Sequence, residues 1–181
     1  DADTDKETFL SPGSAGALLR AVGGAIKAVD MVLDGEVTNA FVAMRPPGHH
    51  AEKTLPMGFC VFANIAIAAK HALEVHRLSR VAVVDFDVHH GNGTQALLQD
   101  DPRVLFITSQ QMPLWPGTGL ASDRGPHQTV LNIPLAPGTD GTHALKEYQC
   151  KALPALNNFQ PELILISAGF DAHQDDPLAQ L

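Results

Sequence analysis

The chain has 181 residues, enough for one domain with a substantial core, and its 45% hydrophobic content excludes wholesale disorder. Its net charge of −8 argues against direct nucleic-acid binding, because phosphate recognition requires clustered Lys and Arg. No apolar run is long enough to predict a membrane-spanning helix. The two cysteines, Cys60 and Cys150, are far apart, so we expect a reduced, cytoplasmic protein.

Helices and strands are predicted to alternate along the chain. Apolar residues recur every three or four positions from Leu18 to Leu33, which predicts an amphipathic helix. Further helices are predicted over residues 64–75, 94–98 and 142–157. Short apolar runs predict strands at 39–44, 81–84, 104–108, 129–133 and 162–167, and the run at 81–84 is also rich in β-branched residues.

This alternation, without hairpin signals, predicts an α/β fold in which a parallel sheet carries helices on both faces. No repeat or linker divides the chain, so residues 1–181 are expected to form a single domain. The acidic stretch 1–7 is expected to be a solvated arm. The chain opens without a Met, and we expect it to be a piece of a longer protein, incomplete at both ends.

The strand at 81–84 leads directly into a cluster of ionisable residues: Asp85, Asp87, His89 and His90. Alternate strand residues point to the same side, so Asp87 and His89 can reach one point in space. That point lies beyond the carboxyl end of a strand, where open α/β sheets place their ligands. A carboxylate and an imidazole converging there are suitable ligands for zinc or iron(II).

Two other predicted strands deliver similar groups. The strand at 39–44 runs into a loop, non-helical because of its two prolines, that carries His49 and His50. The last predicted strand is followed by a loop that carries Asp171. Parallel strands end at the same edge of a sheet, so these three loops are expected to meet there.

The converging groups predict a metal-assisted hydrolase. Asp87, His89 and Asp171 form a three-ligand set, which leaves a catalytic zinc open positions for water and substrate. The adjacent His49 and His50 can supply the base and acid that amide hydrolysis needs.

Each of the two tandem imidazoles needs an orienting partner, and Asp85 and Asn92 are the candidates. One ionic and one neutral partner would separate the basicities of the two histidines. Four other histidines are expected on the solvated surface, namely His71, His76, His127 and His143.

With these loops in place, the sequence resembles the histone deacetylase superfamily, in its zinc-dependent, class II-like bacterial branch. This group also contains acetylpolyamine amidohydrolases and acetoin-utilisation proteins. The resemblance is carried by the motifs RPPGHHA (45–51), GFCVFAN (58–64), DFDVHHGNGTQ (85–95), PGTG (116–119) and SAGFDAH (167–173). They occur in family order and span nearly the whole chain.

The resemblance implies an arginase/deacetylase-like fold and a role for each matched residue. Asp87, His89 and Asp171 match the family's zinc ligands. His49 and His50 match its tandem histidines, with His50 as the general base and acid and His49 in an electrostatic role.

The resemblance also places the residues around these groups. Asp85 and Asn92 match the hydrogen-bonding partners of the tandem histidines. Gly58, Phe59 and Trp115 match substrate-binding positions, where the two aromatic residues wall the tunnel for an acyl-lysine side chain. An apolar slot suits that side chain once acylation has removed its charge.

A structural monovalent cation, usually potassium, is bound in the family by main chain that corresponds to Asp85, Asp87 and His89, together with Thr108. The family's transition-state tyrosine lies in a Gly-Gly-Tyr loop well downstream of the last zinc ligand, and Tyr148 does not match it. The N-terminal part that forms the tunnel rim in the family is also absent from this sequence.

The leading hypothesis is a zinc-dependent amidohydrolase that removes acetyl or other acyl groups from lysine side chains of peptides and proteins, or from acylated polyamines. An arginase-like metallohydrolase is a second hypothesis, although arginases use two metals and more Asp ligands. A third is a non-catalytic module that binds acyl-lysine. No oligomeric state follows from the sequence.

Overall fold

The structure is a computed structural model that describes residues 7–181, so the expected arm at 1–7 lies outside it except for the exposed Glu7. The strands are β1 (Val81–Asp85), β2 (Val104–Gln111), β3 (Val130–Leu135) and β4 (Leu163–Ser167). The helices are α1 (Ser14–Leu33), α2 (Asn64–Glu74), α3 (Asn92–Leu98), α4 (Gly141–Glu147), the π-helix η1 (Tyr148–Ala152) and α5 (Leu153–Phe159).

The four strands form one parallel sheet in the order β3-β2-β1-β4. β1 lies inside the sheet between β2 and β4, and all five of its residues are buried. Such a strand is covered on both faces, which explains its continuous Val-rich sequence. The predicted α/β fold with a parallel sheet is confirmed.

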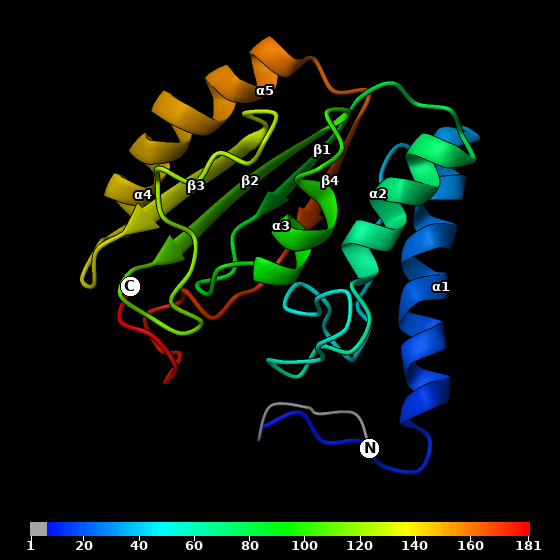
Figure 1. Ribbon diagram of the computed structural model, residues 1–181, viewed down its shortest axis with the longest axis horizontal. Coiled ribbons are helices and arrows are strands. Elements are labelled where there is room, and N and C mark those ends of the chain that lie inside the picture. The colour runs from blue at the N-terminus through cyan, green and yellow to red at the C-terminus, as the bar shows by residue number, and fades with distance from the viewer. Residues whose placement is uncertain (1–6) are drawn as a thin grey trace.

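Helices cover both faces of the sheet (Figure 1). Alternate residues of β1 separate the core into two clusters, with Val81 and Val83 on one side and Ala82 and Val84 on the other. The first cluster includes residues of α1, α2 and α3, and the second includes residues of α4, η1 and α5. Each face of the sheet therefore has its own apolar core.

Small residues bring α2 close to its neighbours. Ala68, Ala69 and Ala72 are almost fully buried in the core that α2 shares with α1 and β1. At its first residue, Asn64 Nδ2 donates to Pro46 O at 3.1 Å. The N-terminal end of α2 thus holds the loop that carries His49 and His50.

The strand predicted at 39–44 is wrong. These residues have no strand partner in the part of the chain that the structure describes, and Phe41 is 77% exposed. A β-carbon at Gly24 of α1 would lie 3.4 Å from Val42 and 3.5 Å from Met44, so the side chains of this segment pack against α1 instead. A short apolar run is not sufficient for a strand, because a strand also requires a hydrogen-bonding neighbour.

The single helix predicted at 142–157 is interrupted by η1. Pro154 lies two residues beyond η1 and has no N–H to continue the normal helical pattern. The N–H of Leu153 donates to Tyr148 O, five residues back, which is the wider spacing of a π-helix. β2 is longer than predicted and extends to Gln111. Within residues 7–181, no helix is long and apolar enough to cross a membrane.

Replacing Phe106 with Ala tests the core between the sheet and α1–α3. Phe106 is 1% exposed in that core, so the cavity left by Phe106→Ala should lower the free energy of unfolding by about 3–5 kcal/mol. Urea denaturation measures the change. The control Phe9→Ala removes a ring that is 85% exposed and should cost about 0.5 kcal/mol or less; equal losses in both variants would contradict the assigned core.

Candidate active site

Asp87, His89 and Asp171 converge at the carboxyl edge of the sheet. Asp87 and His89 follow β1, and Asp171 follows β4, the strand paired in parallel with β1. His89 Nδ1 lies 2.8 Å from Asp171 Oδ2 and 3.2 Å from Asp87 Oδ1. One ligand atom from each of the three residues lies within 4.8 Å of the others. The structure therefore brings together the three residues that the sequence marked as metal ligands.

Main-chain hydrogen bonds fix the two carboxylates. The N–H of Val88 donates to Asp171 Oδ1 at 2.9 Å, which leaves Asp171 Oδ2 directed at His89. The N–H of His89 donates to Asp87 Oδ1 at 2.8 Å. A β-carbon at Gly169 would collide with Asp87 Oδ2, so only glycine fits there without moving the carboxylate.

The charges of this cluster favour a cation. Burial opposes protonation of His89, but hydrogen bonds to Asp171 and Asp87 outweigh it and raise the pKa of His89 to about 9. Without a metal ion, the proton on His89 supplies the positive charge that balances the two carboxylates. One imidazole nitrogen and two carboxylate oxygens are also a suitable donor set for Zn²⁺ with open positions for water and substrate. The residues present fit a zinc ion.

His49 and His50 lie beside this cluster and have different partners. His49 Nδ1 is 3.0 Å from Asp85 Oδ2, and its Nε2 is 3.6 Å from Asp87 Oδ2. Asp85 is completely buried, and its other oxygen accepts the N–H of Asp87 at 3.1 Å. His50 Nδ1 is 2.8 Å from Asn92 Oδ1. The sequence expectation of one ionic and one neutral partner matches these contacts.

The surroundings of Asn92 define the tautomer of His50. Asn92 Nδ2 donates to Glu52 Oε1 at 2.8 Å and to Met57 Sδ at 3.4 Å. A carboxylate only accepts, so the amide nitrogen faces Glu52 and the amide oxygen faces His50. His50 Nδ1 must therefore donate, which leaves the lone pair on His50 Nε2. Glu52 and Met57 are site residues that the sequence reasoning missed; Glu52 lies within the expected His49–His50 loop.

The two imidazoles differ strongly in basicity. Burial favours the neutral form of His49, but the charge and hydrogen bond of Asp85 and the charge of Asp87 raise the pKa of His49 to about 9. Burial, followed by the positive charge of His49, lowers the pKa of His50 to about 3 against the weaker opposing effect of Asn92. At neutral pH the pair therefore consists of a cationic His49 and a neutral His50.

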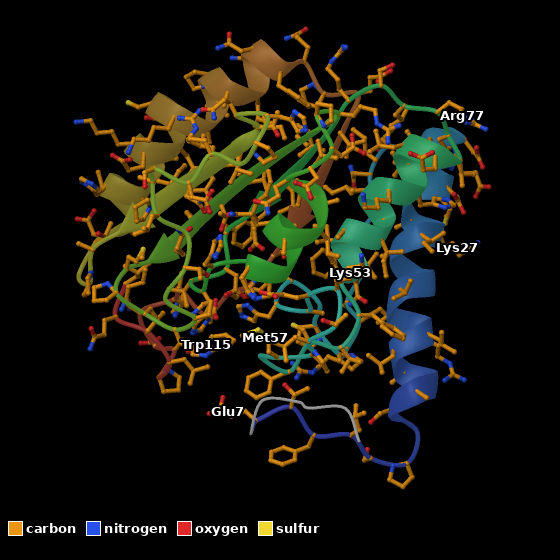
Figure 2. All side chains as sticks on the ribbon, viewed as in Figure 1. Glu7, Lys27, Lys53, Met57, Arg77 and Trp115 are labelled. Carbon is orange, nitrogen blue, oxygen red and sulfur yellow. The ribbon has the colours of Figure 1, made fainter. Side chains whose placement is uncertain are left out.

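Aromatic and glycine residues form the outer part of the site. The ring of Trp115 contacts the edge of His50, with 4.7 Å between centroids and an interplanar angle of 77°. Gly58 has a φ of +56°, and a β-carbon there would collide with His50 and crowd Trp115. Met57 and Trp115 lie on the side of the molecule that the carboxyl ends of the strands face (Figure 2).

Phe59 is half exposed, with a φ of +63°, and its N–H donates to Thr8 Oγ1 at 3.1 Å. It lines a hollow of about 770 Å³ together with Phe9, Arg45 and Leu178 among others. Neither Trp115 nor the three metal-ligand candidates line this hollow, so it lies beside the candidate active site and not within it.

His90 anchors the loop that follows Trp115. It is 3% exposed, with Nδ1 2.7 Å from Thr118 Oγ1 and Nε2 3.0 Å from Gln95 Oε1. Burial lowers the pKa of His90, so it is a neutral hydrogen-bonding group. A β-carbon at Gly119 would collide with the His90 ring. Because glycine has none, the PGTG motif can approach His90 closely. His90 thus fixes the loop position and not the metal cluster.

Three other sequence expectations concern Thr108, Tyr148 and the outlying histidines. Thr108 is fully buried and is the β2 partner of Asp85, but a potassium site there stays a prediction. The Tyr148 hydroxyl lies 2.7 Å from Ser109 Oγ, on the face of the sheet covered by α4, η1 and α5, so it is not placed as a transition-state donor.

The histidines outside the site divide into two pairs. His127 and His143 are exposed, as predicted. The prediction for His71 and His76 is wrong, because their side chains are only 18% and 17% exposed and both contact Asp30. The helical pattern placed them on the outer surface of α2, whereas packing against α1 covers them.

The profile of the histone deacetylase domain family matches residues 1–181, and the chain belongs to that family. It is 45% identical over 172 residues to histone deacetylase 14, chloroplastic, of Arabidopsis thaliana. It is 44% identical over 177 residues to the histone deacetylase-like amidohydrolase of Pseudomonas aeruginosa. The matches cover 93% and 95% of this chain, but only 40% and 46% of those proteins.

Solved structures agree with this family membership. The HD domain of HDA15 superposes with a TM-score of 0.93 at 36% identity, over 97% of this chain and 53% of that one. An acetylpolyamine aminohydrolase from Burkholderia pseudomallei gives a TM-score of 0.83 at 34% identity, over 88% of this chain and 47% of that one. The chain therefore spans about half the length of the relatives it matches.

Gly169→Ala tests the close approach of β4's loop to Asp87. The added methyl group must displace the Asp87 carboxylate, and we expect zinc affinity to fall about ten- to a hundredfold. Competition with a chromophoric chelator measures the affinity. The control Gly23→Ala adds the same group in α1, where no atom lies within 4 Å, and should leave zinc affinity unchanged; unchanged affinity in both variants would contradict the proposed role of Asp87.

Proposed function

We propose that the chain is the central portion of one deacetylase-like catalytic domain and that the protein is a zinc-dependent amidohydrolase. The observation that carries this proposal is the convergence of Asp87, His89 and Asp171 beside a neutral histidine whose free lone pair is on Nε2. The substrate class we propose is an acylated lysine side chain or an acylated polyamine. Relatives named as histone deacetylases and an acetylpolyamine aminohydrolase support it.

Asp87, His89 and Asp171 would hold the zinc ion. A bound zinc ion would lower the pKa of water and polarise the acyl carbonyl. His50 would accept a proton from the attacking water at Nε2 and then deliver it to the leaving amine. Asn92 keeps this atom unprotonated between turnovers by accepting the hydrogen of Nδ1.

His49 would act through its charge. It lies between Asp85 and Asp87, which hold it cationic, and its ring centroid is 3.8 Å from that of His50. This charge keeps His50 neutral and ready to accept a proton. It also favours the negative charge that develops on the carbonyl oxygen during water attack.

His50→Ala separates catalysis from metal binding. We expect zinc content to stay at its original level and kcat to fall about 10²- to 10⁴-fold, because only the proton-transfer group is lost. Asp171→Ala should lose the zinc ion held by Asp87, His89 and Asp171, and activity with it. The assay follows acetate release from an acetyl-lysine peptide and an acetylated polyamine by the full-length protein, with His127→Ala on the exposed surface as the control.

Full activity in His50→Ala would overturn the base assignment. Binding of the acetyl-lysine peptide without any acetate release by the unsubstituted full-length protein would favour the non-catalytic module instead.

Asn92→Asp tests the electrostatic difference between the two histidines. A carboxylate in place of the amide would favour protonated His50 and raise the pKa of His50 from its low value. Activity that requires neutral His50 should then be lost at higher pH than in the unsubstituted protein, so the acidic limb of the kcat/KM profile moves upward. An unmoved acidic limb would show that His50 is not the titrating base.

A further inference from the structure

A second cluster of metal-ligand residues lies between α1 and the end of α2. Asp30 belongs to α1, His71 to the last turn of α2, and His76 follows directly after the α2 C-cap residue. His71 Nε2 is 2.6 Å and His76 Nε2 is 2.7 Å from the same atom, Asp30 Oδ1. Two imidazoles from different positions along the chain thus meet at one carboxylate oxygen.

A tight turn after α2 places His76 beside His71. Arg77 has a φ of +61°, in the left-handed region that non-glycine residues seldom adopt, and the N–H of Leu78 donates back to Ala72 O at 3.2 Å. The rings of His71 and His76 consequently lie 5.5 Å apart at an interplanar angle of 72°. Edge-on rings with both Nε2 atoms directed inward are compatible with coordination of one ion.

The cluster resembles the candidate active-site set in its dimensions. Both groups combine imidazole nitrogen and carboxylate oxygen atoms that lie within 4.8 Å of one another, and both are partly buried. A tetrahedral ion with bonds of about 2.0–2.1 Å separates its ligand atoms by roughly 3.3 Å. To make room for an ion, Asp30 Oδ1 therefore has to move away from each of the two Nε2 atoms by less than about 1 Å. The Asp30 side chain is 39% exposed and has room to do so.

The donor set also favours a metal over hydrogen bonds alone. Without an ion, both imidazoles must carry their proton on Nε2 and donate to a single oxygen atom. With an ion, both Nε2 lone pairs and the carboxylate bind it directly. The partial exposure of the three side chains, at 18%, 17% and 39%, leaves solvent access for water to complete the coordination.

We propose that Asp30, His71 and His76 form a second site for a divalent transition-metal ion of the zinc type, separate from the active site. Imidazole nitrogen and carboxylate oxygen together suit such an ion better than Mg²⁺ or Ca²⁺, which prefer oxygen ligands alone. The ion fastens α1 to the end of α2 and to the turn that follows.

The two sites lie at opposite ends of α2. The first residue of α2, Asn64, holds the loop of the tandem histidines through Pro46 O, whereas His71 lies in its last turn. A helix of 11 residues is about 16 Å long, and Figure 2 shows Arg77 at the end of α2 remote from Met57 and Trp115. Metal binding at one site can therefore be removed without touching the other.

Zinc content after chelation, reloading with Zn²⁺ and gel filtration tests the proposal. We expect two zinc ions per chain in the unsubstituted protein and one in Asp171→Ala. The triple variant Asp171→Ala/His71→Gln/His76→Gln should hold none. As a matched control, His127→Gln and His143→Gln in the Asp171→Ala background remove two exposed histidines and should leave the single zinc in place.

Loss of all zinc in Asp171→Ala, or retention of one zinc in the triple variant, would overturn the second site. Failure of the active-site proposal looks different, because the zinc count would then be unaffected by Asp171→Ala and would fall only in the His71 and His76 variants.

Asp30→Asn covers the case in which the histidine variants do not fold. The amide keeps an oxygen that can accept from imidazole, so a purely hydrogen-bonded cluster should retain its structure, while the loss of the anionic ligand should weaken zinc binding at least tenfold. In the Asp171→Ala background, Zn²⁺ should raise the melting temperature of the protein, and adding Asp30→Asn should make that rise smaller at the same Zn²⁺ concentration. An equal rise in both proteins would contradict the proposal.

Discussion

The parallel pairing of β1 with β4 is the constraint on which the proposed active site depends. It aligns Asp85 with Ser167, and the N–H of Phe86 continues the ladder by donating to Ser167 O at 3.2 Å. The segments beyond both strands therefore leave the sheet side by side. The N–H of Val88 then reaches Asp171, and the metal-ligand set closes across a sequence separation of more than 80 residues. A slip of one residue between these strands would turn the side chains of one strand to the other face of the sheet. The three metal-ligand candidates would then no longer meet.

Electrostatics follow from this geometry. Asp85 is completely buried, and the cost of burying its charge is offset by His49, which becomes cationic in return. That positive charge and burial together keep His50 neutral, while Asn92 selects its tautomer. The same polar groups thus satisfy one another structurally and keep His50 neutral, as its proposed role in proton transfer requires. In this chain, the buried hydrogen bonds that satisfy these polar groups are also the ones on which the proposed chemistry depends.

The sequence predicts those parts of the molecule that follow from local pattern. The Val-rich run of β1 and the polar residues directly after it specify a buried parallel strand and a site at its end. The segment at 39–44 has a similar apolar pattern without a strand partner, and no local signal reveals that difference. Likewise, periodicity puts His71 on the surface of α2, but only the packing of α1 brings Asp30 to it. The local sequence pattern does not determine the contacts between segments that are far apart in the chain.

Anomalous diffraction at the zinc absorption edge, from crystals of the zinc-loaded protein, tests the central claim most directly. The account predicts a peak bonded to Asp87, His89 and Asp171, with Nε2 of His50 facing the open side of the ion. A fully occupied zinc elsewhere, with no peak among these three residues in protein that hydrolyses an acetyl-lysine peptide, would contradict it.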